Sequence, residues 1–437
     1  MQILHWQQLD DEGRRAALAR PSAALQPQLL QQAQAIIDAV RREGDAAIGR
    51  YTREFDGVHS DDVRVGEAEF AAARAQLTPE QYAAIEKAIA NVDSFHRAGL
   101  PAPLSMEVQP GVRCERVTRP LGAVGLYVPA GGAPLPSTVI MLAVPARIAG
   151  CPQRVLCTPP QAGGHANAAV LVAAQLCGIE QVFKIGGAQA IAALAYGSAS
   201  VPKVVKIFGP GNAWVTAAKQ LVAADPAGAA LDMPAGPSEV LVIADDSARA
   251  EFVAADLLAQ AEHDALSQAI LLTTSAALAA QVAEAVRSQL QQLTRRAILL
   301  KSTSHSRILV VPDLDAALAI SDSYAPEHLI IQTRQPRALL ERVHNAGSVF
   351  LGSWSPEPLG DYCTGPNHVL PTYGYARAYS GLSVQDFTRR MTVQELSADG
   401  LRELGPTAST LARLEGLDAH AAAVELRLTA LRRERAA

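Results

Sequence analysis

Apolar residues recur along the first part of the chain at the spacing of amphipathic helices. Between Pro27 and Phe55 they repeat every three or four positions, and a second stretch of the same kind runs from Thr78 to Phe95. Pro79 suits the first turn of the second helix. The φ angle of proline is already close to the helical value, and the N–H group that proline lacks would have no helical partner in the first turn. The pattern therefore predicts a helical N-terminal region.

From Gly122 onward, short apolar runs alternate with helical segments in two successive series. The predicted strands of the first series are Ala123–Val128, Arg154–Thr158, Gln181–Ile185 and Val204–Phe208, and its helices are Ser137–Ile148, His165–Leu176 and Gln189–Ala195. The strands of the second are Glu239–Ile243, Gln268–Thr273, Arg307–Val311, Leu329–Gln332 and Ser348–Leu351, and its helices are Ser247–Glu262, Ala276–Leu293, Leu314–Tyr324 and Pro336–His344. Alternation of this kind is typical of parallel sheets covered by helices on both faces.

We therefore predict an α/β protein with two doubly wound parallel-sheet domains and a ligand-binding cleft between them. After Gly381 the pattern changes to a polar link followed by helices around 401–414 and 419–433. The most apolar stretch, Leu135–Ile148, is short and interrupted by prolines and Arg147, so we do not expect it to span a membrane.

Composition narrows the class of protein. The chain has 437 residues, of which 49% are hydrophobic and 19% charged, a balance that argues against disorder. The net charge of −5 gives no basic excess for a nucleic-acid partner. Five cysteines without a C-x-x-C pair favour a reducing compartment, and the first residues do not resemble a secretory signal. We expect a cytoplasmic protein with neither nucleic-acid nor membrane partners.

Two glycine-rich turns each follow a predicted strand and begin a predicted helix. Gly186-Gly-Ala-Gln189 and Gly209-Pro-Gly-Asn212 both offer backbone amides where helix N-termini bind phosphates or carboxylates. Neither matches the G-x-G-x-x-G or G-K-[ST] pattern, so ordinary strand-to-helix turns remain an alternative. Gln189 and Asn212 are the polar side chains that favour binding.

Several side chains have the chemistry of metal ligands. Gln260 and His263 lie three residues apart at the end of a predicted helix, so both can project to one side. The alternative is a helix C-terminus at which His263 contacts the last carbonyl groups, because glutamine is an uncommon zinc ligand. Asp361, His368 and His420 would extend a nitrogen and oxygen donor set, although a local turn, helix caps or surface positions also explain them.

Glu327 and His328 stand side by side at the entrance of the predicted strand 329–332. In such a pair one residue can act as a general base while the carboxylate activates a water molecule. The alternative is a solvated turn between a helix and a strand. Cys114, Cys151 and Cys363 have no adjacent histidine or lysine to activate a thiolate, so we interpret them as packing residues.

Nine ordered blocks between about residues 20 and 430 resemble the histidinol dehydrogenase family. They are Gly125–Pro129, Gly186–Ala190, Lys206–Asn212, Asp232–Glu239, Gln260–His263, Tyr324–Leu329, Gly360–Asp361, Pro366–Pro371 and Leu414–His420. One departure is Ala130, which stands in a turn where the family usually has Pro-Gly-Gly.

The resemblance implies a zinc enzyme that oxidises L-histidinol through L-histidinaldehyde to L-histidine, the last two steps of histidine biosynthesis, and consumes two NAD+. The implied ligands of one zinc ion per subunit are Gln260, His263, Asp361 and His420. Glu327 and His328 would be the catalytic acid/base pair. The implied substrate contacts are Ser238, His328 and Glu415 together with the zinc ligands, and the implied NAD contacts are Tyr127, Gln189 and Asn212.

The resemblance also implies a division of the chain and a partner. It suggests an N-terminal tail at 1–25, a first incomplete-Rossmann-like domain at 26–122 plus 239–381, a second at 123–238, and a helical tail at 382–437. That tail, with Glu415 and His420, would complete the active site of the other subunit in a homodimer. Two alternatives remain open from the residues alone. One is a zinc hydrolase that uses the same metal set, and the other is a non-catalytic two-lobed binding protein.

Overall fold

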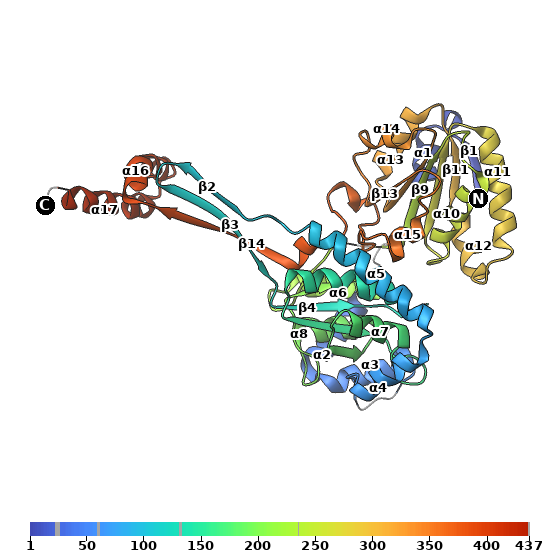
Figure 1. Cartoon of the computed structure of the whole chain (residues 1–437), viewed down its shortest axis with the longest axis horizontal. Helices are drawn as coiled ribbons and strands as arrows, with labels where there is room; N and C mark the ends of the chain where they lie inside the picture. Colours follow the sequence, from blue (N-terminus) through green and yellow to red (C-terminus); the bar gives the residue numbers. More distant parts are fainter. Residues whose placement is uncertain (22–26, 59–61, 131–132, 235, 436–437) are drawn as a thin grey trace. The chain divides into compact units, whose positions relative to one another are not determined.

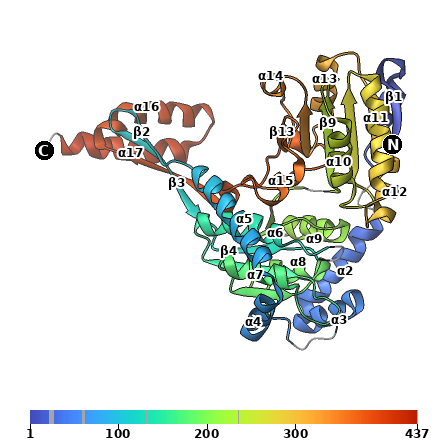
Figure 2. The same ribbon diagram turned by 45° about the vertical axis from the view of Figure 1, so that its right-hand side comes forward.

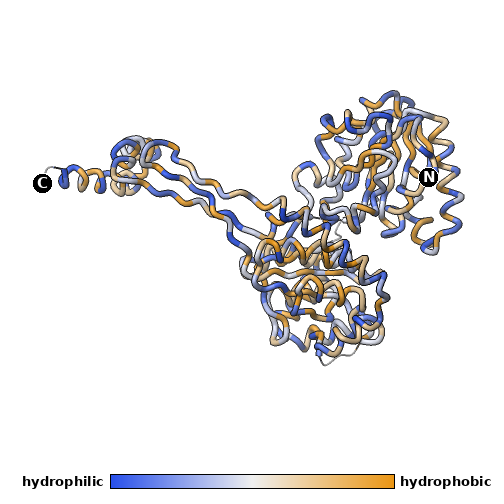
Figure 3. Tube along the Cα trace, viewed as in Figure 1, coloured by the Kyte–Doolittle hydropathy of each residue, from blue (hydrophilic) through white to orange (hydrophobic). Residues whose placement is uncertain are grey.

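The computed structural model of the protein describes residues 1–21, 27–58, 62–130, 133–234 and 236–435 (Figure 1). The chain forms two compact units, Met1–Gly99 with Leu121–Phe387, and Leu100–Pro120 with Thr388–Ala437. The larger unit contains two parallel sheets, which confirms the predicted α/β class. Hydrophobic residues are concentrated in the strands of these sheets and in the helices that cover them (Figure 3).

A six-stranded parallel sheet has the order β1-β11-β10-β9-β12-β13. Its strands are β1 (Gln2–His5), β9 (Glu239–Ala244), β10 (Gln268–Thr273), β11 (Arg307–Val310), β12 (His328–Gln332) and β13 (Ser348–Leu351). Every residue of β9, β10 and β12 is buried, as expected for strands that helices cover on both faces.

Two groups of helices pack on this sheet (Figure 2). One face is covered by α10 (Ala250–Ala261), α11 (Ala276–Leu290) and α12 (Arg296–His305). The other face is covered by α1 (Asp11–Leu18), α13 (Leu314–Tyr324) and α14 (Pro336–Leu340). The short helix α15 (Glu357–Tyr362) follows β13, and the 3-10 helices are η1 (Trp6–Gln8), η2 (Tyr375–Arg377) and η3 (Val384–Phe387).

A five-stranded parallel sheet has the order β6-β5-β4-β7-β8. Its strands are β4 (Ala123–Tyr127), β5 (Gln153–Thr158), β6 (Gln181–Lys184), β7 (Lys206–Phe208) and β8 (Ala230–Leu231). One face packs on α4 (Glu67–Gln76), α5 (Pro79–Ala98), α6 (Pro136–Ala149) and α7 (Ala168–Leu176). The other packs on α2 (Pro27–Glu43), α3 (Asp45–Asp56), α8 (Gly187–Tyr196) and α9 (Ala213–Ala224).

The N-terminal part differs from the expected division in two ways. The segment expected as a tail contributes β1, which pairs with β11 at the edge of the six-stranded sheet. The helices α2 to α5 cover the five-stranded sheet and not the six-stranded one, because their apolar faces pack against α6 to α9. The single helix expected over 27–55 is divided at Gly44, which adopts a φ of 57°. Residues 22–26 of the expected tail lie outside the described residues.

The smaller unit contains an antiparallel sheet in the order β14-β3-β2 and two helices. The elements are β2 (Leu104–Gln109), β3 (Val112–Pro120), β14 (Thr388–Leu396), α16 (Ala398–Leu414) and α17 (Asp418–Glu434). Both predicted helices are present, but the expected polar link is largely strand β14. Almost all residues of β2 and β14 are exposed, so these strands lack the alternation of a half-buried sheet that would reveal them.

Among the helices of the described residues, we find none that combines the length and the apolar character needed to cross a membrane.

Candidate metal and acid–base site

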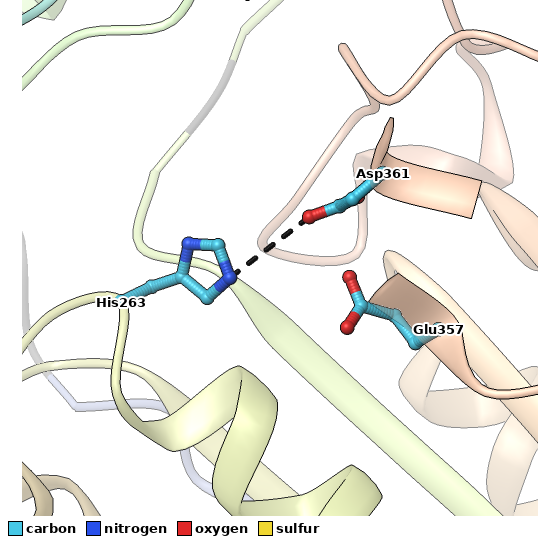
Figure 4. Close-up of side chains that lie close together, drawn as sticks. All are labelled: His263, Glu357 and Asp361. Atoms are coloured by element: carbon cyan, nitrogen blue, oxygen red, sulfur yellow. Dashed lines mark ion pairs between the residues drawn. The ribbon is translucent and has the colours of Figure 1, made fainter. Parts of the chain in front are cut away.

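Three side chains from two distant parts of the chain meet beside the six-stranded sheet (Figure 4). His263 lies just after α10, and Glu357 and Asp361 lie one turn apart on α15. One ligand atom of each lies within 4.8 Å of those of the other two. The distance from His263 Nε2 to Asp361 Oδ2 is 3.9 Å. An imidazole and two carboxylates at this spacing are suited to a divalent cation.

His328, the first residue of β12, lies beside this cluster. Its Nε2 atom is 3.6 Å from Asp361 Oδ1 and 3.8 Å from Glu357 Oε1. Its Nδ1 atom is 3.2 Å from the backbone oxygen of Glu239, and because a carbonyl only accepts, Nδ1–H is the donor. The ring therefore presents Nε2 to the carboxylates of α15.

Glu327 is buried next to His328. The backbone N–H of Glu239 donates to Glu327 Oε2 over 2.8 Å, and the same oxygen is 3.5 Å from His328 Nδ1. Glu327 and His328 are 6% and 3% exposed, so the solvated turn considered as an alternative is excluded. Sequence reasoning placed the pair correctly at the strand entrance.

Burial and charge together perturb the acidities of the cluster. Burial opposes the imidazolium of His328, but the carboxylates of Glu327 and Asp361 outweigh it and hold the pKa of His328 well above its usual value. Burial, reinforced by the Asp361 carboxylate, raises the pKa of Glu357 to about 9. Burial opposes the ionised form of Asp361, but the nearby rings of His328 and His368 outweigh it and lower the pKa of this carboxyl group.

Two oxygen atoms near the cluster have no hydrogen-bond partner among the described residues. Gln260 Oε1 is buried one helical turn before His263, and Glu357 Oε1 is buried within the cluster itself. Buried polar atoms are rarely left unpaired, and each such atom needs an explanation. A bound cation would account for the unpaired Gln260 oxygen, and the combination of an imidazole, a carboxylate and an amide oxygen fits zinc or a similar divalent ion.

The other predicted ligand and substrate residues are distributed between the two units. Ser238 directly precedes β9, and its carbonyl accepts the N–H of Gln268. Glu415 caps the C-terminus of α16, and His420 lies in the first turn of α17, both exposed in the smaller unit. Their contribution to the site of another subunit stays a prediction.

The predicted nucleotide residues surround the glycine turns of the five-stranded sheet. The Tyr127 hydroxyl accepts the N–H of Gly187 over 3.1 Å, and Gln189 is buried in the next turn with Oε1 unpaired within the described part of the chain. A Cβ atom at Gly209 would lie 2.1 Å from the Tyr127 carbonyl oxygen, so only glycine fits there. The two turns thus meet at the carboxyl edge of β4, β6 and β7, where α/β sheets bind nucleotides.

Asn212 has a different role in the geometry of this edge. Its side-chain oxygen accepts the N–H groups of Trp214 and Val215, so it caps α9 while remaining exposed. The departure at Ala130 directly precedes residues 131–132, which lie outside the described residues, so the expected turn is not described.

Sequence reasoning missed Glu357 and left the role of His368 open. The prolines of the segment 356–366 concealed α15, although Glu357 and Asp361 have the four-residue spacing of one helix face. His368 Nδ1 is 2.7 Å from the backbone oxygen of Asp361, and its Nε2 is 3.3 Å from Thr138 Oγ1 on α6. His368 therefore holds the backbone at Asp361.

Comparison with known proteins identifies the family. The family model described as histidinol dehydrogenase matches residues 19–428. A histidinol dehydrogenase of Vibrio vulnificus (strain YJ016) is 53% identical over 431 residues, 99% of each chain. One of Xanthomonas euvesicatoria pv. vesicatoria (strain 85-10) is 56% identical over 428 residues, which is 98% of this chain and 99% of that protein.

A solved structure agrees over the whole length. The crystal structure of histidinol dehydrogenase from Elizabethkingia anophelis is similar with a TM-score of 0.95 and 43% identity, and the match covers 99% of each chain. These similarities confirm the family resemblance and the fold class expected from the residues. The chain belongs to the histidinol dehydrogenase family and is an oxidoreductase.

Proposed function

We propose that the protein oxidises L-histidinol to L-histidine through L-histidinaldehyde, with two NAD+ as hydride acceptors and one zinc ion per subunit. The observation that carries this proposal is the buried His328, which lies between Glu327 and the donor cluster of His263, Glu357 and Asp361. Family membership favours dehydrogenation over the hydrolytic use of the same residues.

Gln260, His263 and Asp361 would hold the zinc ion, completed by His420 from a second copy of the chain. The unpaired oxygen of Gln260 and the proximity of His263 to Asp361 support this set. When bound, zinc supplies a positive charge that orients the amino alcohol and polarises its oxygen. Glu357 remains beside the ligands as a buried carboxyl group.

In the first oxidation, His328 accepts the alcohol proton at Nε2 while the carbinol carbon loses hydride to NAD+. The hydrogen bond from Nδ1–H to Glu239 leaves Nε2 as the basic atom that faces the cluster. The carboxylates of Glu327 and Asp361 favour the imidazolium, and a divalent cation held by Asp361 would offset that preference and leave His328 as a neutral base.

In the second oxidation, Glu327 activates the water that adds to the aldehyde, and the resulting hydrate loses a second hydride to NAD+. Its carboxylate is buried and fixed by the N–H of Glu239, which leaves one oxygen available for water. Tyr127, Gln189 and Asn212 would contact the dinucleotide at the carboxyl edge of the five-stranded sheet.

We propose a homodimer in which Glu415 and His420 of the smaller unit complete the site of the partner subunit, as the family resemblance implies. Helices α16 and α17 expose large apolar side chains, including Leu414 at 78% and Leu426 at 71%. Exposed apolar side chains of this kind are characteristic of surfaces that become buried in an interface with another protein chain.

The test is an assay of the dialysed protein with L-histidinol and NAD+, with and without added zinc. The proposal expects two NADH for each histidine formed, and a rate that falls on zinc removal and returns on zinc addition. Histidinol turnover without NADH, or no turnover in the zinc-loaded protein, would refute it.

A further inference from the structure

The backbone of Glu239 contacts both members of the acid/base pair. Its N–H donates to Glu327 Oε2 over 2.8 Å, and its carbonyl oxygen accepts from His328 Nδ1 over 3.2 Å. One residue of β9 thus sets the orientation of the Glu327 carboxylate and the tautomer of His328.

The strand register explains why these backbone groups face Glu327 and His328. Pairing between β9 and β12 begins at Val240 with His328, one residue after Glu239. On the other side of β9, the carbonyl of Ser238 accepts the N–H of Gln268 on β10. Because successive residues of a strand direct their backbone groups to opposite sides, the N–H and C=O of Glu239 point toward β12. The two catalytic side chains bind them there.

The side chain of Glu239 is held by charge-assisted bonds. Arg20 donates from Nε to Oε1 over 2.7 Å and from Nη2 to Oε2 over 2.8 Å, and the N–H of Tyr373 donates to Oε1 over 2.6 Å. Arg20 also lies 3.8 Å from the ring centre of Tyr324 and donates to its carbonyl oxygen. A bidentate pair of this kind is geometrically specific.

The residues around the ion pair of Arg20 and Glu239 hold it in one geometry. Glu239 is 2% exposed, and its partner Arg20 comes from a segment 219 residues away in sequence. Tyr373 is one of two non-glycine residues with positive φ in the described part of the chain, at 55°, and its N–H is directed at Glu239 in that conformation. Strained backbone persists where surrounding contacts require it.

We propose that Arg20 and Glu239 are positioning residues for the oxidation chemistry, because their ion pair fixes the peptide groups that orient Glu327 and His328. The inference rests on the proposed function of that pair. Neither Arg20 nor the Glu239 carboxylate need contact the substrate. Their effect is on the geometry of proton transfer, and a misplacement of about 1 Å costs roughly 100-fold in rate.

The kinetic test compares Arg20→Gln, Arg20→Lys, Glu239→Gln and the double variant Arg20→Gln/Glu239→Gln as zinc-loaded enzymes. Each single variant should lower kcat for histidinol oxidation by roughly 10- to 100-fold while KM for histidinol changes little. Lysine keeps the charge but not the planar fork, so it should restore little activity. Because the two residues act as a unit, the double variant should be no slower than the worse single variant.

The matched control is Arg147→Gln, which breaks an ion pair between α5 and α6. Arg147 Nη2 is 2.9 Å from Asp93 Oδ1, and the pair makes no contact with Glu239. Its kcat should match the wild type even where its thermal midpoint is lowered. An equal loss of kcat in this control would assign the effect to general destabilisation and overturn the proposal.

A second readout does not depend on turnover. The hydrogen-bonded Nδ1–H of His328 should give a downfield imidazole proton resonance in the zinc-loaded wild type, identified by its absence in His328→Asn. The resonance should shift or disappear in Arg20→Lys and Glu239→Gln and persist in Arg147→Gln.

The two readouts separate the possible failures. An unchanged resonance together with wild-type kcat in the Arg20 and Glu239 variants would overturn the positioning role. If the wild type does not oxidise histidinol, the proposed function fails, while the resonance still decides whether Arg20 positions His328. If Arg20→Gln does not fold, Arg20→Lys and Glu239→Gln decide the outcome.

Discussion

Replacing Asp256 by asparagine should stabilise the protein most strongly above neutral pH. Asp256 lies on α10, is 4% exposed, and accepts one hydrogen bond at Oδ2 from Gln332 Nε2 over 2.7 Å. Burial raises the pKa of this carboxyl group to about 7, and the bond from Gln332 only partly opposes the rise. At neutral pH and above, folding therefore keeps a poorly solvated charge in the interior.

The free energy of unfolding depends on pH because the folded and unfolded states bind protons at Asp256 with different affinities. Between the usual pKa of 3.8 and the folded value of about 7, the folded state holds a proton that the unfolded state has released. The free energy of unfolding therefore falls as pH rises through this range and levels off above the folded pKa. Asparagine carries no charge, so this loss is absent, while its carbonyl oxygen still accepts from Gln332.

The magnitude follows from the same pKa difference. Relative to wild type, the stability of Asp256→Asn should rise by roughly 2 to 3 kcal/mol between about pH 5 and about pH 8. The asparagine amide also offers a donor to Gln332 Oε1, which is buried without a partner in the residues described.

Urea unfolding of both proteins at several pH values measures this difference. Asp246→Asn is the control, since Asp246 is exposed and Arg334 lowers its pKa, so its removal should give no gain as pH rises. A free-energy difference for Asp256→Asn that is the same at both ends of the pH range would refute a raised pKa for this carboxyl group.

Three predictions concern the proposed reaction. His328→Asn should reduce kcat for both oxidation steps by roughly 10²- to 10⁴-fold, as expected for a lost general base, which steady-state assays with histidinol and with histidinaldehyde measure. Glu327→Gln should impair aldehyde oxidation more than alcohol oxidation, and equal losses would argue against its role with water. His420→Asn should lower the zinc content measured by metal analysis. Mixing it with Glu327→Gln should restore part of the activity, because one site of the mixed dimer is intact, and no recovery would contradict the shared site.

The elements with strong apolar patterns were predicted well from the sequence. Strand β10 and helix α13 have the predicted bounds, and β9 and β12 differ by one residue. These strands are buried on both faces, so their sequences read as continuous apolar runs. By contrast, β14 is exposed along nearly its whole length, and β8 has only two residues, so neither leaves a hydrophobic period.

The site shows a different limit of sequence reasoning. Glu327, His328, Gln260, His263 and Asp361 were named from their local patterns and the family resemblance, but no local pattern indicates that they converge. These side chains come together because β12 lies next to β9 in the sheet and because α15, which follows β13, brings Asp361 beside His263 and His328. Glu357 was missed because proline signals obscured its helix.

The position of the acid/base pair explains why backbone groups could be used to hold it. Ligands of parallel α/β sheets usually bind at the carboxyl edge, which is where the glycine turns beside Tyr127 lie. His328 and Glu239, however, are the first residues of β12 and β9, so the pair lies at the amino edge of the six-stranded sheet. The ladder between β9 and β12 begins at Val240 and His328, so the N–H of Glu239 precedes it and can bind Glu327. A carbonyl oxygen has two lone pairs, so that of Glu239 can accept the His328 side chain in addition to a ladder bond. Held by backbone groups on a buried strand, the acid/base pair gains a rigidity that an exposed loop lacks.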